Sequence, residues 1–450
     1  MRSRINGWLT AAFIAIASGA TAQGRDVSQL AARPSAQWVK DAVIYELNPR
    51  TFSTAGTFNA ITDRLDDLRA LGVTVVWLMP IHPLGQLKKK GTIGSPYAVR
   101  DYYAINPSYG TKDDLRRLVG EAHKRGLKVI IDIVANHTAW DNVMMSTPAY
   151  YRRDAQGKIV SPYDWTDVAA LDYANPATRT YMTNMLVYWL REFDLDGFRC
   201  DVAGEVPTDF WENARAELEK IKPDIMMLAE AAKPELLARA FDLDYAWPFY
   251  GTMADVVTSG RNAQDIARTW QEERRAYPRG AMHMRFTENH DEDRAIARFG
   301  ERAAMATDAL VFTLDGAPLL YNGQEAGDVT ESGAPALFEN LKVFWTGAER
   351  RPEMVELIKR LVSLRREHPA LRQGQTVWLR NSDEDRIVTF LRRDGTEEFL
   401  VAVNLSNRPF AGTVEASGTY AEIPTPPNEA RVVALPALSL DAWGFRIFRR

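Results

Sequence analysis

The sequence predicts an α/β protein: a (β/α)8 barrel with a small insert after its third strand, followed by a C-terminal all-β sandwich domain. Strand-like and helical runs alternate along residues 38–372, which is typical of a parallel barrel. Several strand-like runs are apolar at nearly every position, as expected for strands covered on both faces. From residue 373 to 450 the helical pattern is replaced by short alternating runs, which predicts the second domain.

Composition limits the classes of partner. The chain has 450 residues, of which 46% are hydrophobic and 25% charged, and this is ordinary for a globular protein with a large core. The net charge is −4, with acidic and basic residues interspersed, which argues against nucleic acid or an anionic membrane as the main partner. Cys200 is the only cysteine, so no intrachain disulfide can form.

The N-terminus has the pattern of a secretory signal peptide. A basic start precedes an apolar run from Trp8 to Ala17, and the small residues Ala20-Thr21-Ala22 follow. The apolar run is short for a membrane span, which leaves an uncleaved anchor as the less favoured alternative. We therefore expect residues 1–22 to be removed from a secreted or periplasmic protein without a membrane anchor. Residues 23–37 are expected to form a flexible lead-in.

The first repeating units follow the lead-in. Val43–Leu47 is a short strand-like run, and apolar positions from Ile61 to Leu71 form a helical stripe that ends at Gly72. Val73–Met79 is nearly all apolar and is stopped by Pro80, which predicts a second strand buried on both faces.

The alternation then continues to residue 366. Further strands are predicted at 128–134, 194–201, 224–230, 243–245, 284–290 and 318–322. Further helices are predicted at 113–125, 178–193, 211–220, 236–241, 263–275, 302–314 and 354–366. A doubly wound open sheet is the rival architecture, but no G-x-G-x-x-G follows the first strand. Residues 138–177 have no clean period and are rich in aromatic residues, which predicts a small inserted subdomain.

Polar side chains gather where the predicted strands end, and barrel enzymes place their active sites at the carboxyl ends of the strands. The set comprises Asp132, Asn136 and His137 after the third strand, Arg199 and Asp201 at the fourth, Glu230 at the fifth, and Glu288 to Asp291 at the seventh. Converging carboxylates suit glycoside hydrolysis, because a retaining glycosidase needs a nucleophile and an acid/base roughly 5 Å apart.

The surroundings of each carboxylate favour a different role. Asp201 lies two residues from Arg199 on one face of a strand, and a neighbouring cation favours the ionised form that a nucleophile needs. Glu230 follows an apolar strand, and burial favours the protonated form that a general acid needs. Asp291 could hold sugar hydroxyls in the transition state. A structural ion pair is the plainer interpretation of Arg199 and Asp201.

Taken together, these strand ends resemble the four signature regions of the alpha-amylase family, glycoside hydrolase family 13. The matching segments are Asp132-x-x-x-Asn136-His137, Gly197-Phe198-Arg199-Cys200-Asp201, Glu230 and Asn289-His290-Asp291, supported by Ser95-Pro96-Tyr97 and Tyr321-Asn322-Gly323-Gln324-Glu325. Each motif alone is weak, but all of them in order at strand ends form a specific signal.

The resemblance implies a secreted retaining hydrolase of α-1,4-glucosidic bonds in starch, glycogen or maltodextrins, acting through a covalent glycosyl-aspartate. It implies Asp201 as nucleophile, Glu230 as acid/base, Asp291 as transition-state stabiliser, Arg199 as the residue that orients Asp201, and Tyr97, His137 and His290 around the sugar ring. The alternatives on the same fold are a transglycosylase, a cyclomaltodextrinase or neopullulanase-like enzyme, and a glucoside isomerase. A non-catalytic carbohydrate-binding homologue is disfavoured because all three carboxylates are present.

Three features leave the specificity open. Many amylases carry a Lys-His pair shortly after the nucleophile, whereas this chain has Val202-Ala203-Gly204-Glu205. Trp247, like Trp140 and Trp165, could stack on sugar rings, although packing within the protein is an equal alternative. The run Lys88 to Lys90 is expected to be a solvated group of charges.

The chemistry itself requires no cofactor, but a structural Ca²⁺ is one expectation. Asn136 matches a position that often binds calcium in the family, and Asp172, with Asp164 and Asp167, supplies hard oxygen donors nearby. The alternative is that these aspartates cap turns.

Overall fold

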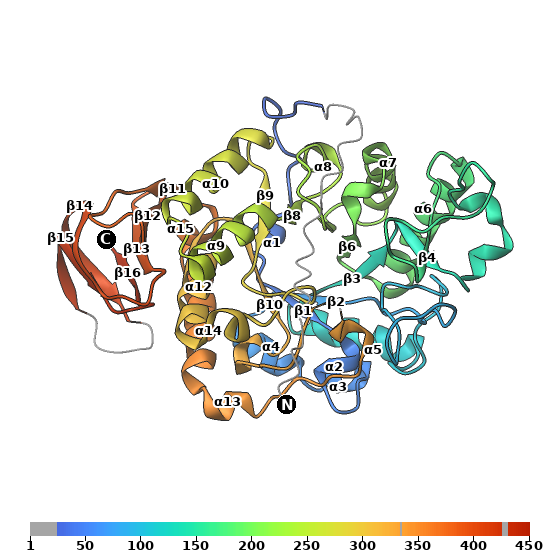
Figure 1. The fold of residues 1–450 in the computed structure, drawn as a ribbon, viewed down its shortest axis with the longest axis horizontal. Coiled ribbons are helices and arrows are strands. Elements are labelled where there is room, and N and C mark those ends of the chain that lie inside the picture. The colour runs from blue at the N-terminus through green and yellow to red at the C-terminus, as the bar shows by residue number, and fades with distance from the viewer. Residues whose placement is uncertain (1–24, 334, 425–430) are drawn as a thin grey trace, which may run out of the picture.

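The computed structural model describes residues 25–333, 335–424 and 431–450, and the predicted signal peptide lies outside these residues. Parallel strands close into a barrel in the order β1-β10-β9-β8-β7-β6-β3-β2, which confirms the predicted (β/α)8 architecture (Figure 1). The barrel strands are β1 (Ile44–Leu47), β2 (Val75–Leu78), β3 (Lys128–Val134), β6 (Gly197–Asp201), β7 (Met226–Ala229), β8 (Leu243–Tyr245), β9 (Met282–Arg285) and β10 (Ala317–Tyr321).

Helices surround the barrel and cover the outer faces of its strands (Figure 1). The larger ones are α4 (Leu65–Leu71), α5 (Lys112–Lys124), α6 (Pro176–Phe193), α7 (Thr208–Glu219), α9 (Trp247–Ser259), α10 (Gln264–Ala276), α12 (Glu301–Thr313) and α14 (Pro352–Glu367). The short ones are α1 (Gln37–Lys40), α2 (Pro49–Phe52), α3 (Phe58–Thr62), α8 (Leu236–Arg239), α11 (Ala295–Phe299), α13 (Gly347–Arg350) and α15 (Pro369–Gln373). None of the helices in the described ranges has the length and apolar character that crossing a membrane would need.

Two differences from the predicted helices concern α3, α4 and α9. The single helix expected from Ile61 to Leu71 is divided into α3 and α4 by a break at Asp63 and Arg64. Helix α9 was not predicted; it begins at Trp247 with Pro248 in its first turn, where a proline is tolerated because the N–H it lacks would have no partner. Helix α9 places Trp247 directly after strand β8.

The barrel interior contains charged side chains as well as apolar ones. Strands β1, β2, β6 and β7 are buried at every position, as their apolar sequences predict. Glu46, Asp132 and Arg199 are nevertheless completely buried among them. Buried charges are costly unless they are paired, so these residues mark a region of the barrel with a purpose other than packing.

Gly197 allows strand β6 to lie close to strand β7. Its φ angle is +149°, and a Cβ atom there would lie 1.9 Å from the carbonyl oxygen of Met226. Since that neighbour is backbone within a sheet, it cannot move aside without breaking the barrel hydrogen bonds of β7.

We therefore expect Gly197→Ala to destabilise the protein by about 3 kcal/mol or more, because it forces a clash between two central strands. Thermal unfolding followed by circular dichroism measures the effect. Gly120→Ala is the matched control: Gly120 lies in helix α5, where a Cβ meets nothing within 4 Å. The control should be neutral or slightly stabilising, and an equal loss in both variants would contradict this explanation.

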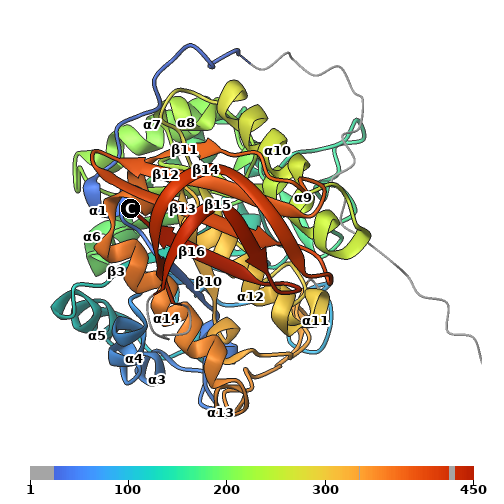
Figure 2. The ribbon, with the colours of Figure 1, turned by 90° about the vertical axis from the view of Figure 1, so that its left-hand side faces the viewer.

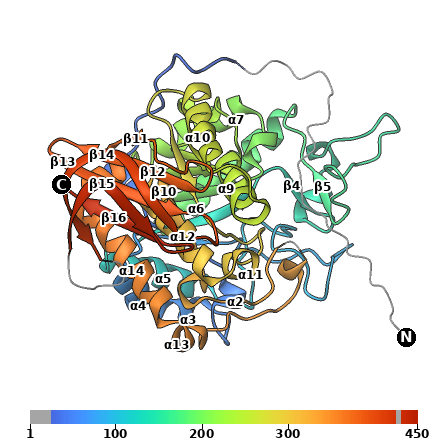
Figure 3. The same ribbon diagram turned by 60° about the vertical axis from the view of Figure 1, so that its left-hand side comes forward.

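The insert after β3 forms a small subdomain at the opposite end of the molecule from the C-terminal domain (Figures 1 and 3). It contains the antiparallel pair β4 (His137–Ala139) and β5 (Val168–Ala170) and the 3-10 turns Val143–Ser146 and Pro148–Tyr150. Lys88 and Lys89 are exposed, as expected for a solvated run, whereas Lys90 is partly buried. The Nζ of Lys88 lies 3.5 Å from the centre of the Trp140 ring, and that of Lys90 lies 3.0 Å from Asp167, so these lysines join the loop after β2 to the insert.

The C-terminal domain is all-β, as predicted. Its six strands are paired antiparallel in the order β11-β12-β13-β16-β14-β15, with β11 (Gln375–Trp378), β12 (Ile387–Asp394), β13 (Glu397–Asn404), β14 (Phe410–Ile423), β15 (Val432–Leu440) and β16 (Phe445–Arg449). The hydrogen bonding runs through one sheet, which folds around its own apolar core of residues such as Leu400, Phe410 and Phe448. The sheet packs against α10, α12 and α15 on the side of the barrel (Figure 2).

The described part of the lead-in is held against the barrel, and the expectation that residues 23–37 are flexible was wrong for it. Arg33 forms ion pairs with Glu219 and, at 2.7 Å, with Asp242, and the hydroxyl of Ser35 donates to the same Asp242 at 2.8 Å. Its partners lie about two hundred positions further along the chain, so local sequence reasoning cannot anticipate them.

Candidate active site

Arg199 is the centre of the group of polar residues at the carboxyl ends of the strands. Its Nη1 lies 2.9 Å from Asp132 and 3.1 Å from Asp201, and its Nη2 lies 3.0 Å from Glu230. Its Nε donates to the hydroxyl of Tyr245 at 3.1 Å. One guanidinium on β6 therefore contacts carboxylates from β3, β6 and the end of β7. The sequence suggested only its contact with Asp201.

Asp201 is the last residue of β6, and its side chain is 7% exposed. Burial and the neighbouring Glu230 raise the pKa of Asp201 well above its usual value, although Arg199 opposes them. From the sequence, Arg199 was expected to keep Asp201 ionised. In the structure, burial and Glu230 together outweigh the effect of Arg199 on this pKa. The carboxyl groups of Asp201 and Glu230 face the same cation.

Glu230 follows β7 and is less buried than its sequence suggested, with 17% of its side chain exposed. The backbone N–H of Val202 donates to its Oε2 at 2.8 Å. Val202 has φ +45°, which is rare for a β-branched residue and indicates local strain. Val202 is the first residue of the stretch 202–205 that departs from the usual amylase pattern. Its N–H therefore helps to position the predicted acid/base, Glu230.

Two histidines in the site differ in charge. His137 is buried beside Trp165, with its Nε2 3.9 Å from Asp201, and burial lowers its pKa to about 4, so it is neutral near pH 7. Burial would also lower the pKa of His290, but Asp291 and Glu46 raise it well above its usual value. The site therefore contains one imidazole and one imidazolium.

His290 connects the predicted third carboxylate to the barrel interior. Its Nε2 lies 3.1 Å from Asp291 and 2.7 Å from the hydroxyl of Tyr97, and its Nδ1 is hydrogen-bonded to Glu46. The Tyr97 ring also stacks on the imidazole, with ring centres 5.3 Å apart. Burial disfavours the charge of Asp291, but His290 lowers the pKa of this carboxyl below its usual value. Asp291 therefore stays ionised.

The hydroxyl of Tyr97 continues this network by donating to Asp132 at 3.1 Å. Burial raises the pKa of Asp132 to about 6, although Arg199 opposes it. The network thus runs from His290 through Tyr97 and Asp132 back to Arg199, and it brings together the predicted site residues on β3, β6 and the loops after β2 and β9.

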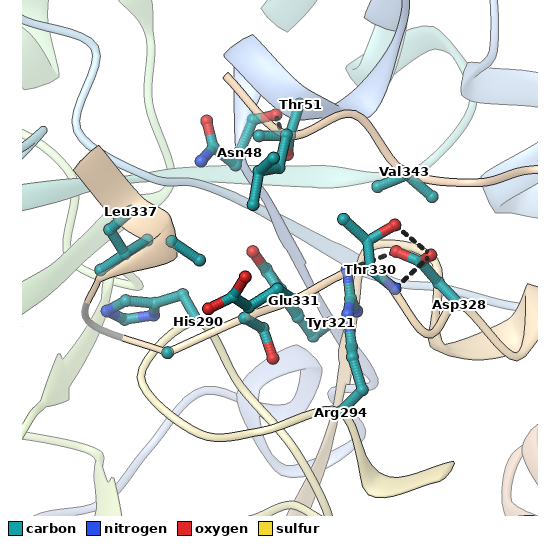
Figure 4. A pocket seen from close by; sticks show the side chains of 14 residues that line it. Asn48, Thr51, His290, Arg294, Tyr321, Asp328, Thr330, Glu331, Leu337 and Val343 are labelled. Carbon is teal, nitrogen blue, oxygen red and sulfur yellow. Dashed lines mark hydrogen bonds and ion pairs between the residues drawn. The ribbon is translucent and has the colours of Figure 1, made fainter. Parts of the chain in front are cut away.

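Residues between 328 and 343, which follow β10, line one side of a cavity beside His290. The cavity has a volume of about 20 Å³ and is lined by His290, Tyr321, Glu331 and Leu337, among others (Figure 4). Arg294 fixes this side of the cavity through ion pairs with Glu288 at 2.8 Å and Asp328 at 2.9 Å.

The sequence model of the alpha-amylase catalytic domain matches residues 45–165 and 161–345 of this chain. The chain belongs to the alpha-amylase family. It is a glycoside hydrolase of this family, as its motifs predicted.

Two solved structures of similar proteins share the fold over nearly their whole length, and further relatives are similar in sequence. A maltogenic alpha-amylase of Thermotoga neapolitana is 32% identical, with a TM-score of 0.85 over 92% of this chain and 99% of that one. An alpha-amylase of Lactobacillus plantarum is also 32% identical, with a TM-score of 0.83 over the same shares. An alpha-amylase of Haloarcula japonica is 29% identical over 85% of this chain, which spans only 59% of that enzyme's length. A cyclomaltodextrinase of Geobacillus thermopakistaniensis is 27% identical, over 82% of this chain and 70% of its own.

The tryptophans proposed to stack on sugars lie around the site of this enzyme. Trp247 stacks on Tyr245, with ring centres 5.3 Å apart, and remains partly exposed. Trp165 packs edge-on against His137 at 5.5 Å. Trp140 lies under Lys88 and donates its indole N–H to the carbonyl of Thr166 at 3.0 Å. Trp165 therefore lies beside His137 and Trp247 beside Tyr245, the hydrogen-bond partner of Arg199, whereas Trp140 packs within the insert.

The residues predicted to bind calcium make other contacts in the described part of the chain. The carboxylate of Asp172 accepts the N–H of Ala174 at 2.9 Å, and the amide of Asn136 contacts the His137 ring at 3.3 Å. Asp167 is paired with Lys90, whose ammonium neutralises it. Within the described ranges, no group of three or more His, Cys, Asp or Glu residues could hold a metal. These contacts favour turn capping over metal binding.

We therefore expect dialysis against EDTA to leave both the melting temperature and the turnover number unchanged, because Asp172 accepts a backbone N–H and Asp167 is paired with Lys90. Thermal unfolding and starch assays before and after dialysis measure this. A drop of about 5 °C or more that calcium alone restores would contradict it.

Proposed function

We propose that this enzyme is a retaining hydrolase of α-1,4-glucosidic bonds that acts on maltodextrins, starch and glycogen. The observation that carries the proposal is the shared contact of Asp201 and Glu230 with the two terminal nitrogens of Arg199, at 3.1 and 3.0 Å. Two carboxyls held by one guanidinium suit the short separation of retaining enzymes, roughly 5 Å, better than the wider separation of inverting ones.

The first chemical step uses both carboxyls. Glu230 donates its proton to the glycosidic oxygen while a carboxylate oxygen of Asp201 attacks the anomeric carbon, and the bond to the leaving sugar breaks. The productive form carries this proton on Glu230, which the Val202 N–H and Arg199 hold in place. The product of this step is a glycosyl ester of Asp201 with inverted configuration.

The second step reverses these roles. Glu230, now ionised, takes a proton from water, the resulting hydroxide attacks the anomeric carbon, and Asp201 leaves as a carboxylate. Two inversions give overall retention. In this proposal the ionised Asp291, held by the His290 imidazolium, accepts hydrogen bonds from sugar hydroxyls, and these bonds strengthen as the ring gains oxocarbenium character.

The names of similar proteins support short and cyclic α-glucans as additional substrates. Relatives of 24–28% identity include a cyclomaltodextrinase of Thermoanaerobacter pseudethanolicus and an intracellular maltogenic amylase of Bacillus subtilis. We therefore include cyclodextrins in the proposed range, and transglycosylation of the covalent intermediate to a second sugar is the main competing outcome.

A substrate panel tests this assignment. Starch, maltoheptaose, β-cyclodextrin and pullulan are compared with sucrose and trehalose, and products are separated by chromatography. We expect maltose and glucose from the first three, with the α-anomer formed first. Rapid formation of products longer than maltoheptaose would assign transglycosylation instead. Cleavage of sucrose or trehalose alone would reject the α-1,4-glucan proposal.

We also propose that residues 1–22 direct export and are removed after Ala22. The basic, apolar and small-residue pattern supports this. N-terminal sequencing of protein from the medium or periplasm of the producing cells should begin at Gln23, whereas recovery of uncleaved protein from the cytoplasm alone would contradict it.

A further inference from the structure

Glu46 is a buried carboxylate to which no motif assigns a role. It lies in the middle of β1, in an otherwise apolar run, and is completely buried. Its Oε1 is hydrogen-bonded to Nδ1 of His290, while its Oε2 has no hydrogen-bond partner among the described residues. A half-satisfied buried carboxylate is costly, so its interaction with His290 must offset that cost.

The second ring nitrogen of His290 faces the reacting groups. Nε2 lies 3.1 Å from Asp291 and 2.7 Å from the Tyr97 hydroxyl, which itself donates to Asp132. Glu46 and Asp291 therefore lie against opposite nitrogens of one ring, an arrangement that a doubly protonated imidazolium satisfies by donating to both. The His290 ring lies between the buried carboxylate of Glu46 and the carboxylate of Asp291.

We propose that Glu46 is a positioning residue for Asp291, acting through His290. The Glu46 carboxylate fixes the orientation and the Nδ1 proton of the ring, and the ring in turn presents an Nε2–H to the carboxylate that faces the sugar. This inference deepens the proposed function and depends on it for the role of Asp291 in turnover.

Other charged and titratable groups around His290 must be considered for its protonation. Those in the network or beside the adjoining cavity are Tyr97, Asp132, Arg199, Tyr321, Arg294, Asp328 and Glu331. Arg294 is paired with Glu288 and Asp328, and Arg199 is paired with three carboxylates. Glu46 and Asp291 are therefore the two groups that bond the ring directly with negative charge. Burial opposes the charge on His290, but together they raise its pKa well above the usual value.

The test removes the charge of Glu46 but keeps the size of its side chain and its ability to accept a hydrogen bond. Glu46→Gln can still accept from Nδ1, but it no longer stabilises an imidazolium. We expect kcat on maltoheptaose at about pH 8, relative to that at about pH 6, to fall by about tenfold or more against the wild type, while KM changes little. Glu46→Asp, which keeps the charge, should restore part of the alkaline activity.

Glu273→Gln is the matched control. Glu273 is also a buried glutamate, on α10, and its Oε2 contacts Arg285 at 3.3 Å outside the cleft. It should lose stability without any change in the pH dependence of kcat. A folded Glu46→Gln protein whose pH profile superimposes on the wild type would overturn the proposal.

A second measurement does not require turnover. NMR titration of the six histidines, with His290 assigned by its loss in His290→Gln, reports its protonation in substrate-free wild-type enzyme. We expect His290 to stay protonated through about pH 8. A neutral His290 at about pH 7 would overturn the proposal even if the glucan hydrolase assignment holds. Conversely, absence of maltoheptaose cleavage with a protonated His290 would reject only the proposed function.

Discussion

Asp201→Asn is expected to lower kcat on maltoheptaose by about 10⁴-fold or more. The asparagine amide keeps the size of the side chain but cannot attack the anomeric carbon and leave again, so the covalent route is lost. The remaining groups of the site still bind substrate, and KM should therefore change far less than kcat. Initial rates from reducing-sugar release at saturating substrate provide the measurement.

Stability separates a catalytic loss from a folding loss. Burial and Glu230 raise the pKa of Asp201, so the folded state binds this proton more tightly than the unfolded state. The free energy of unfolding of the wild type therefore falls as pH rises above the unfolded pKa of about 3.9 toward the raised folded value. Asparagine removes this penalty, so near neutral pH the variant should melt at the same temperature as the wild type or higher.

Asp209→Asn is the control for this variant. Asp209 lies on the outer helix α7 and pairs with Arg179 at 2.7 Å on the surface. It should retain full turnover and nearly full stability, because surface ion pairs contribute about 0–1 kcal/mol. Wild-type turnover in Asp201→Asn, or an equal loss in Asp209→Asn, would contradict the assignment of the nucleophile.

Glu230→Gln is the second variant with a large expected effect, and its effect should depend on the leaving group. A sugar alkoxide leaves slowly without protonation, so turnover of maltoheptaose should fall by about 10³-fold or more. Fluoride needs no proton to leave, so attack of Asp201 on α-maltosyl fluoride should be slowed much less. Hydrolysis of the resulting ester should then be slow, because no base activates water.

An added nucleophile tests whether hydrolysis of the glycosyl ester is slow because the general base is missing. Azide needs no general base, so it should accelerate turnover of α-maltosyl fluoride by Glu230→Gln and yield maltosyl azide of α configuration. Equal losses on both substrates, without any effect of azide, would remove Glu230 from the acid/base role.

The residues that could be predicted from sequence are those whose position follows from strand order. Asp132, Arg199, Asp201 and Glu230 come at the carboxyl ends of successive apolar strands, and a parallel barrel gathers such ends at one rim. His290 and Asp291 follow β9 in the same way. The fold could also be predicted from sequence, because apolar residues are spaced differently along buried strands and along amphipathic helices.

Other features depend on contacts between distant segments. The bond between Glu46 and His290 joins positions 244 residues apart, although a lone glutamate in an apolar strand was a signal that could have been read. The balance of charge on Asp201 depends on burial, which the flanking Arg199 did not reveal. The hydrogen bond from the Val202 N–H to Glu230 depends on a backbone conformation that is unusual for valine. Asp172 had the right chemistry for calcium, but its position in a turn uses its carboxylate for a backbone N–H.

The central claim is that Asp201 forms the covalent bond to the sugar while Glu230 transfers protons. The most direct test is mass spectrometry of Glu230→Gln after incubation with α-maltosyl fluoride, followed by proteolysis and sequencing of the modified peptide. We predict one maltosyl group on the peptide that contains Asp201, with the ester located on that residue, and no adduct in Asp201→Asn with Glu230→Gln. A maltosyl group on Asp291 instead, or rapid release of α-maltose with no adduct at any time, would contradict this mechanism.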